Sequence, residues 1–256
     1  MASEAGEFWS IGDYATIGEY WRQAGRDVAA TLDVEGTDVI DLATGTGVTA
    51  IAIAQRGAQS VLGVDAAPKL LAEAANRAEA LDLEIDWEEA DFATVPRPDG
   101  SADLIVSTFG IIFASDPGAV FHECRRLLRP EGQLVFTSWA ATGLFGRMID
   151  AFAPFFEGGE APWHEDADGI HSTVGADAQV VERTFQLSAP SAAAFVANLE
   201  LHSSPFIVAK EKLGDDWGDA RSALLDIFEG SGETTPAGYV SEISYLVTTA
   251  NRATLA

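Results

Sequence analysis

Two acids and two closely spaced glycines are the residues of this sequence whose types and spacing are best suited to binding a ligand. The segment VIDLATGTG over residues 39–47 places Asp41 just before a turn that contains Gly45 and Gly47. Glycine lacks a Cβ, so such a turn between a strand and a helix lets the backbone approach a ligand closely. Asp65 ends the next apolar run, eighteen residues after Gly47, where an acid can accept hydrogen bonds from both hydroxyls of a ribose. These residues predict a site for a cofactor that contains a nucleoside.

The same pattern leaves more than one cofactor open. The spacing Gly45-x-Gly47-x-x-Ala50 also fits a dinucleotide fingerprint, which would make the protein an NAD-dependent oxidoreductase. Asp41 would serve a pyrophosphate poorly, whereas it suits a cationic sulfonium ligand whose amino-acid ammonium group it could receive through water or backbone. An oxidoreductase also predicts a Tyr-Lys or His catalytic pair, and the sequence has no Tyr-x-x-x-Lys. A protein that binds the cofactor without catalysis stays open as a third hypothesis.

An open α/β sheet is needed to bring these residues together. Short apolar runs alternate with helical stripes, which predicts βαβ units joined by right-handed crossovers. The predicted fold class is α/β, with a Rossmann-like seven-stranded mostly parallel sheet, helices on both faces and a helical lid insertion after strand five. We expect strands over 38–43, 60–65, 83–87, 103–107, 133–139, 180–187 and 239–248, and helices over 15–32, 48–56, from 68, 117–128, 192–201 and 217–228.

We expect one domain over residues 1–256. Residues 9–140 would form the cofactor-binding core, and residues 141–176 and 190–235 the lid and the substrate side. The lid is rich in aromatic side chains, which suggests an acceptor with a hydrophobic body, aromatic or isoprenoid, although the same side chains could equally form the core of the lid. These aromatic residues are Phe145, Phe152, Phe155, Phe156 and Trp163.

The order of the motifs resembles that of the class I S-adenosylmethionine-dependent methyltransferases, in the branch similar to ubiquinone and menaquinone methyltransferases. DLATGTG at 41–47 resembles the family's first motif, GVD at 63–65 its second, and Asp91-Phe92 the position after the third strand. LIVSTFG at 104–110 and LLRPEGQLVF at 127–136 resemble the motifs at strands four and five. The resemblance covers residues 9–145 and, with STFGIIFASDP and ATGLFGRM, extends to an actinobacterial-type subgroup of small-molecule methyltransferases.

The resemblance implies S-adenosylmethionine as the cofactor. Asp91 would contact the adenine amino group, and Tyr14 would cover the methionine end of the cofactor. The implied cofactor-binding residues are Tyr14, Asp41, Ala43, Gly45, Gly47, Asp65, Ala66, Asp91, Phe92, Ser107 and Phe109. No catalytic residue is predicted, because methyl transfer from a sulfonium is an in-line displacement that positioning and exclusion of water largely accelerate. His164 and His171 fall in the lid, where either could be a general base or a plain loop residue.

Charge and composition narrow the partners. The chain has 40 acids against 15 bases, a formal net charge of −25, which repels the phosphates of nucleic acids and of anionic membranes. STFG also stands where enzymes that methylate base amines of nucleic acids carry Pro-Pro-aromatic. We therefore expect a small-molecule substrate, no nucleic acid and no stable membrane binding, while the oligomeric state stays open.

Metal binding and localisation follow from what the sequence lacks. Without an HxxxH pattern or clustered cysteines, no metal site is predicted. The segment MASEAGEFWS lacks the features of a signal peptide, and Cys124 alone forms no internal disulfide, so we expect a cytoplasmic protein.

Overall fold

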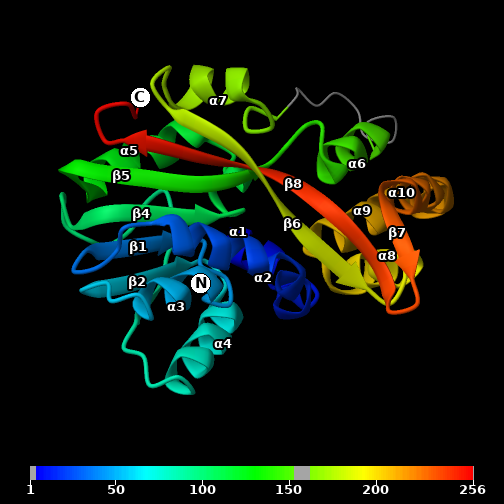
Figure 1. Ribbon diagram of the computed structural model, residues 1–256, viewed down its shortest axis with the longest axis horizontal. Coiled ribbons are helices and arrows are strands. Elements are labelled where there is room, and N and C mark those ends of the chain that lie inside the picture. The colour runs from blue at the N-terminus through cyan, green and yellow to red at the C-terminus, as the bar shows by residue number, and fades with distance from the viewer. Residues whose placement is uncertain (1–3, 153–161, 256) are drawn as a thin grey trace.

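A twisted sheet with helices packed against it organises the computed structural model, which describes residues 4–152 and 162–255 (Figure 1). The helices are α1 (Glu4–Trp9), α2 (Tyr14–Thr31), α3 (Val48–Ala54), α4 (Pro68–Glu79), α5 (Pro117–Leu127), α6 (Leu144–Phe152), α7 (Ala167–Val174), α8 (Ala192–His202), α9 (Ser204–Leu213) and α10 (Trp217–Ser231), with short 3-10 turns η1 (Ile111–Phe113) and η3 (Gly214–Asp216). The strands are β1 (Asp38–Leu42), β2 (Ser60–Asp65), β3 (Asp86–Glu89), β4 (Ala102–Thr108), β5 (Leu128–Trp139), β6 (Gln179–Ala189), β7 (Gly232–Thr235) and β8 (Gly238–Asn251).

The described residues form an eight-stranded sheet, one strand more than the seven expected. Seven strands follow the order β3-β2-β1-β4-β5-β8-β6, and the short β7 pairs with β8. The first five are mutually parallel, whereas β8 runs antiparallel to β5, β6 and β7. The extra strand, GETT over 232–235, is too short to show an apolar alternation in the sequence.

The parallel strands bring the predicted site residues to one edge. β1 and β4 are buried along almost their whole length, as expected for parallel strands covered on both faces. Val39–Asp41 pair in register with Leu104–Val106, and Leu42 pairs with Val64 of β2. The carboxyl ends of β1, β2 and β4 therefore lie side by side, and the loops that follow them face the same space.

Helix α2 has the buried face that the sequence predicts. α2 starts at Tyr14, where the Asp13 side chain caps it by accepting from the Thr16 N–H and, at 2.6 Å, from the Thr16 hydroxyl. Its buried positions include Ile17 and Trp21, which follow the three-to-four spacing seen in the sequence. The short helix α1 was not expected.

The third strand starts three residues later and ends two residues later than predicted. It starts at Asp86, where pairing with Leu62 of β2 begins, rather than at residue 83. The Trp87 ring on this strand packs over two glycines: a Cβ built on Gly63 would lie 2.4 Å from the ring, and one on Gly47 2.8 Å.

The segment after β5 carries the helices α6 and α7. Residues 153–161, and with them Phe155 and Phe156, lie outside the described part of the chain. The long strands β6 and β8 continue past the parallel strands as a ribbon that ends beside α8, α9 and α10 (Figure 1).

Within residues 4–152 and 162–255, no single helix is long and apolar enough to cross a membrane. The helical segments 192–202 and 204–231, bent by 85° at the break between them, together have the length and composition of a span. The described residues contain no group of three or more His, Cys, Asp or Glu side chains placed to hold a metal ion.

Candidate cofactor site and adjoining cavity

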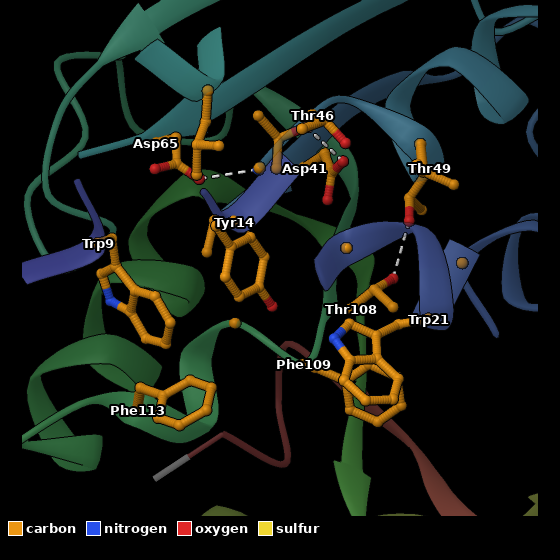
Figure 2. A pocket seen from close by; sticks show the side chains of 18 of the residues that line it. Trp9, Tyr14, Trp21, Asp41, Thr46, Thr49, Asp65, Thr108, Phe109 and Phe113 are labelled. Atoms are coloured by element: carbon orange, nitrogen blue, oxygen red, sulfur yellow. Dashed lines mark hydrogen bonds between the residues drawn. The ribbon is translucent and has the colours of Figure 1, made fainter. Parts of the chain in front are cut away.

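A pocket of about 140 Å³ lies at the carboxyl ends of β1, β2 and β4. Figure 2 shows the two acids at one side of this pocket and a group of aromatic side chains at the other. The lining residues predicted from the sequence are Tyr14, Asp41, Ala43, Gly45, Asp65, Ala66, Phe92 and Phe109.

Asp65 is held between two loops. One carboxylate oxygen accepts from the Gly45 N–H at 2.8 Å, and the other accepts from the Ala67 N–H at 2.9 Å. The residue is 8% exposed. Burial raises the pKa of its carboxyl, and the N–H donors of Ala67 and Gly45 oppose that rise. Each carboxylate oxygen can accept a second hydrogen bond, so both retain capacity toward a ligand in the pocket.

Asp41 has one satisfied oxygen and one without a partner. Its Oδ2 accepts from the Thr44 hydroxyl at 2.7 Å and from the Ala50 N–H at 3.1 Å, whereas no described residue donates to its buried Oδ1. Burial raises the pKa of this carboxyl to about 7, with nearby Asp65 adding to the rise and the bonds from Thr44 and Ala50 opposing it. A cation beside Oδ1 would remove this unpaired buried charge.

The two loops that enclose the pocket begin with strained residues. Ala43 after β1 and Phe109 after β4 both have φ of +54°, a left-handed conformation that costs about 1–2 kcal/mol in a residue with a Cβ. Hydrogen bonds hold them there: the Phe109 N–H donates to the Thr137 hydroxyl at 2.9 Å, and the Ser107 hydroxyl donates to the Leu42 carbonyl at 2.8 Å. Gly45, with φ of +56°, adopts the same region without a Cβ penalty.

Three of the predicted residues do not lie on the pocket wall. Ser107 is fully buried and fastens the end of β4 to the end of β1. Gly47 lies behind the loop against Trp87, and Asp91 is exposed, with its carboxylate accepting from the Ala93 N–H at 2.8 Å. Sequence spacing placed these residues near the site, but the side-chain directions were set by the packing of the loops.

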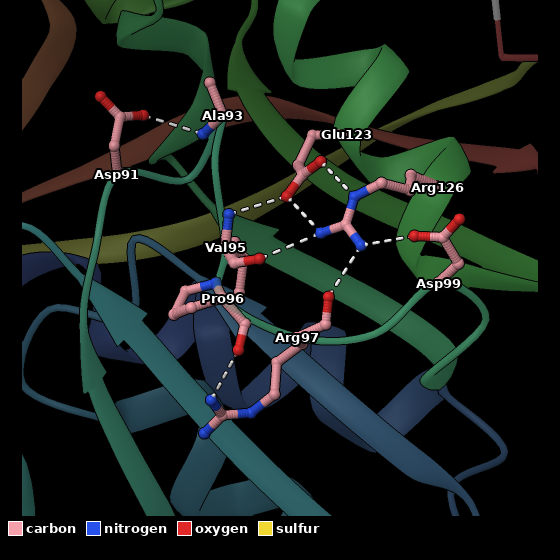
Figure 3. A network of polar contacts seen from close by, with 8 residues as sticks. All are labelled: Asp91, Ala93, Val95, Pro96, Arg97, Asp99, Glu123 and Arg126. Atoms are coloured by element: carbon pink, nitrogen blue, oxygen red, sulfur yellow. Dashed lines mark hydrogen bonds and ion pairs between the residues drawn. The ribbon is translucent and has the colours of Figure 1, made fainter.

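The loop that carries Asp91 and Phe92 is tied to α5 by a polar network (Figure 3). Arg126 donates to the carbonyls of Val95 and Arg97 and to the Glu123 carboxylate. Glu123 in turn accepts from the Val95 N–H at 2.7 Å. The network gives hydrogen-bond partners to the loop backbone at Val95 and Arg97, three and five residues after Phe92.

Apart from Tyr14, sequence reasoning missed the contribution of α2 to the wall, and it missed that of α3. The Thr49 hydroxyl on α3 lies 2.9 Å from the Thr108 hydroxyl at the end of β4 (Figure 2). Gly25 of α2 lies beside them, since a Cβ on Gly25 would be 2.7 Å from Thr49 Oγ1. The lining positions Gly18, Trp21 and Gly25 share one helical face, and that stripe is the signal that could have identified them.

A second cavity of about 320 Å³ adjoins the pocket. Both spaces are lined by the same five aromatic residues, Trp9, Tyr14, Trp21, Phe109 and Phe113. The remaining wall is mostly apolar, and it comprises Ile17, Ile112, Trp139, Phe145, Met148, Ile149, Pro162, Leu199, Pro205 and Phe206, together with the polar His164 and Ser203.

Stacked rings make part of this wall stiff. The rings of Phe109 and Trp139 are parallel within 9°, with their centroids 3.8 Å apart. Phe145 also stacks on Trp139, at a centroid distance of 4.2 Å. Trp21 meets Trp139 and Phe145 edge-on at 5.3 and 5.1 Å. Of the predicted lid aromatics, Phe145 is buried in this cluster, whereas Trp163 packs against Phe121 and Phe136.

The mostly parallel sheet, with a glycine-rich turn after its first strand and a carboxylate at the end of its second, defines a Rossmann-like α/β protein. A comparison with known families matches residues 39–132 to a methyltransferase domain. A protein of Mycobacterium tuberculosis that has no assigned function is 32% identical over 157 residues, which are 60% of this chain and 57% of that protein. The demethylmenaquinone methyltransferase of Thermus thermophilus is 40% identical over 136 residues, 52% of this chain and 60% of that enzyme.

A solved structure has the same fold. The geranyl diphosphate C-methyltransferase of Streptomyces coelicolor, which was solved with S-adenosylhomocysteine bound, superposes with a TM-score of 0.52 at 16% identity, over 90% of this chain and 76% of that one. The chain therefore contains a region similar to a methyltransferase domain over residues 39–132 and shares the fold of this solved enzyme. It spans less than two thirds of the length of the two relatives above.

Proposed function

We propose that the protein transfers a methyl group from S-adenosylmethionine to a small, apolar acceptor. The observation that carries this proposal is the shared aromatic wall between a pocket lined by two acids and an apolar cavity. A cofactor in the first space and an acceptor in the second would meet at Tyr14 and Phe109, which line both.

The residues of the pocket fit this cofactor. Asp65 would accept from the two ribose hydroxyls, since both of its oxygens are fixed by backbone N–H groups and keep accepting capacity. The unpartnered oxygen of Asp41 would receive the ammonium group, directly or through water. Phe92, Ala66 and Leu70 offer an apolar slot for the adenine.

When bound, the cofactor supplies an electrophilic methyl carbon attached to a cationic sulfur. The chain then has to hold the acceptor in line and keep water out. Trp21 and Phe109 provide ring surfaces that attract a cation, and the stack of Phe109 on Trp139 limits their movement. Trp9 and Phe113 meet edge-on at 4.9 Å and line both spaces, while Phe113 remains 48% exposed.

The comparisons support methyl transfer as the reaction class, whereas the evidence on the acceptor comes from the lining of the second cavity. The similar enzyme of Thermus is a demethylmenaquinone methyltransferase, so its acceptor is a small molecule. The apolar lining of the second cavity favours an acceptor with a hydrophobic body, and the net charge of −25 disfavours a nucleic acid. The absence of membrane association and a cytoplasmic location remain expectations from the sequence.

An NAD-dependent oxidoreductase is the competing enzyme class. Its pyrophosphate would have to lie beside the Gly45 loop, where the carboxylates of Asp41 and Asp65 would repel it. Arg22 is the one Lys or Arg side chain among the described residues that line this pocket, and it already donates to Glu19 at 2.7 Å. A protein that binds S-adenosylmethionine without catalysis would show the same pocket, and only turnover of an acceptor separates it from the enzyme.

Calorimetric titration of the full chain with S-adenosylmethionine, S-adenosylhomocysteine and NAD tests the proposal. We expect micromolar binding of the two sulfur ligands and none of NAD. Asp65→Ala should weaken binding at least 30-fold, because it removes hydrogen bonds to a charged group worth about 1.5–3 kcal/mol each. Asp177→Ala, at an exposed position, is the matched control and should bind as the wild type does. Binding of NAD alone would overturn the proposal in favour of the oxidoreductase.

A further inference from the structure

The wall of the second cavity contains a buried serine whose hydroxyl has no hydrogen-bond partner. Ser203 stands just before the first residue of α9, lines the cavity and is 5% exposed. Within the described part of the chain, its Oγ makes no hydrogen bond, to its own helix or elsewhere. Packing does not seal this atom from water, as it seals the unpartnered hydroxyls of Ser138 and Thr248. The Ser203 hydroxyl is therefore available to a molecule in the cavity.

The local sequence explains why this hydroxyl is free. A serine that precedes a helix normally accepts from the N–H of the second or third helical residue, as Ser191 does before α8 from the Ala194 N–H at 3.0 Å. After Ser203 the second helical residue is Pro205, which has no N–H. The N–H of the third, Phe206, donates to the Ser203 carbonyl at 3.0 Å. The first turn of α9 thus offers the hydroxyl no donor to accept from.

Hydrogen bonds on both sides of Ser203 hold it against the segment that leads into α2. The Asp13 N–H donates to the His202 carbonyl at 3.1 Å, and the Ser204 hydroxyl donates at 2.6 Å to the carbonyl two residues before Asp13. Tyr14, the next residue of this segment, lines both the cofactor pocket and the second cavity. Ser203 therefore lies on the α2 side of the cavity, toward the wall that the two spaces share.

The lining of the cavity favours a neutral ligand over a charged one. No Asp, Glu, Lys or Arg stands among the described residues that line it. Burial lowers the pKa of His164 to about 4, so this imidazole is uncharged at physiological pH as well. A carboxylate or an ammonium group would enter an apolar space without a counter-ion, which is costly.

Building on the proposed function, we propose that Ser203 donates a hydrogen bond to a neutral carbonyl oxygen of the acceptor in the second cavity. The N-terminus of α9 carries partial positive charge from the N–H groups of its first turn, which favours a group that offers lone pairs. A carbonyl offers lone pairs and no donor, whereas a hydroxyl or an amine would bring a proton that needs a partner of its own. The bond orients the acceptor beside the shared wall and takes no part in the transfer itself.

Binding of 1-indanone and of indane, the hydrocarbon of nearly the same shape, tests the inference by calorimetry on the full chain saturated with S-adenosylhomocysteine. Because the two ligands also differ in hydration, the quantity to compare between proteins is the ratio of their affinities. Ser203→Ala should lower the relative affinity for the ketone about 3–10-fold, the range for one hydrogen bond. Ser203→Thr, which keeps a hydroxyl, should retain the wild-type ratio within about twofold.

Ser191→Ala is the matched control, because Ser191 also precedes a helix but stands outside the described lining of the cavity. It should leave the ratio unchanged even though it removes a capping bond. A purely structural role of Ser203 would change the affinities for the ketone and the hydrocarbon alike, and so would not move their ratio.

The outcomes separate this inference from the proposed function. If S-adenosylhomocysteine binds but Ser203→Ala keeps the wild-type ratio, or if the wild type binds neither indanone nor indane, the role of Ser203 is overturned and the cofactor assignment stands. Tighter binding of indane-1-carboxylate than of 1-indanone would overturn the choice of a neutral carbonyl. If S-adenosylhomocysteine does not bind the wild type, the proposed function itself fails. S-adenosylhomocysteine binding by each variant reports that it is folded, and Ser203→Gly carries the test if Ser203→Ala does not fold.

Discussion

A Cβ built on Gly110 would lie 2.4 Å from the Cβ of Ala43. These residues belong to the loops that follow β4 and β1, so the two loops touch backbone to side chain beneath the pocket. Ser107 reinforces the contact through its bonds to the Leu42 carbonyl and the Ile111 N–H. Ala43 and Phe109, both in the left-handed conformation, stand at the start of these two loops.

Substitution of Gly110 by alanine should therefore damage the cofactor site. The added methyl group also comes within 3.2 Å of the Leu42 carbonyl, so the loops must separate. We expect a loss of about 1–3 kcal/mol in the free energy of unfolding and at least tenfold weaker binding of S-adenosylhomocysteine. Gly218→Ala, at an open helical position with nothing near its Cβ, is the control. Unchanged affinity in Gly110→Ala would contradict the contact.

Replacement of Asp41 by asparagine should stabilise the fold at alkaline pH while weakening cofactor binding. Because burial raises the pKa of Asp41 to about 7, its stabilising contribution is fully present below about pH 4 and is lost as the pH rises through 7. The amide stays neutral and its oxygen can still accept from Thr44 and Ala50. We expect Asp41→Asn to be about 1–3 kcal/mol more stable than the wild type at pH 8, with no difference near pH 4.

Urea unfolding between pH 4 and 8 measures this effect, and calorimetry measures the binding. Loss of the charge that faces the ammonium group should weaken S-adenosylmethionine by about tenfold or more. A variant that is less stable than the wild type across the whole pH range would show that the carboxylate is not destabilising in the folded state.

His164 should give the opposite pH dependence. Its pKa is lowered to about 4 in the folded protein, so its stabilising contribution is present above about pH 6.5 and is lost as the pH falls through 4. His164→Gln removes this titration and should lose less stability than the wild type between pH 6.5 and 4. His122→Gln should retain the wild-type slope, and equal slopes for all three proteins would argue that His164 is protonated in the folded state.

The Glu123–Arg126 network should matter more than an exposed ion pair. Although burial alone would raise the pKa of Glu123, its bonds from Arg126 and Val95 lower it. Glu123→Gln should cost about 2–3 kcal/mol, because it leaves a partly buried guanidinium short of its charged partner. Asp99→Asn, whose side chain is 81% exposed in its pair with Arg126, should cost less than about 1 kcal/mol. Equal effects in urea unfolding at pH 7 would contradict the importance of burial.

The sequence by itself determined the layers of the fold and part of the cofactor wall. Alternating apolar runs and helical stripes placed the strands that end in Asp41 and Asp65, because a buried parallel strand must be apolar along its length. The Gly45 turn and Asp65 could be assigned to one edge, because the carboxyl ends of parallel strands meet there. These are local patterns, and each depends on residues close together in the chain.

Tertiary structure alone decided what faces the pocket and what lies behind it. Ser107 and Gly47 hold the loops while Thr49 and Trp21 reach the wall, since side-chain direction depends on how helices pack on the sheet and not on spacing within one motif. The second cavity joins α2, the consecutive elements β5 and α6, and α9, which come from three separate parts of the sequence. Burial of His164 in that cavity, and the shift in its pKa, arise from these long-range contacts, because desolvation is a property of the whole surrounding shell.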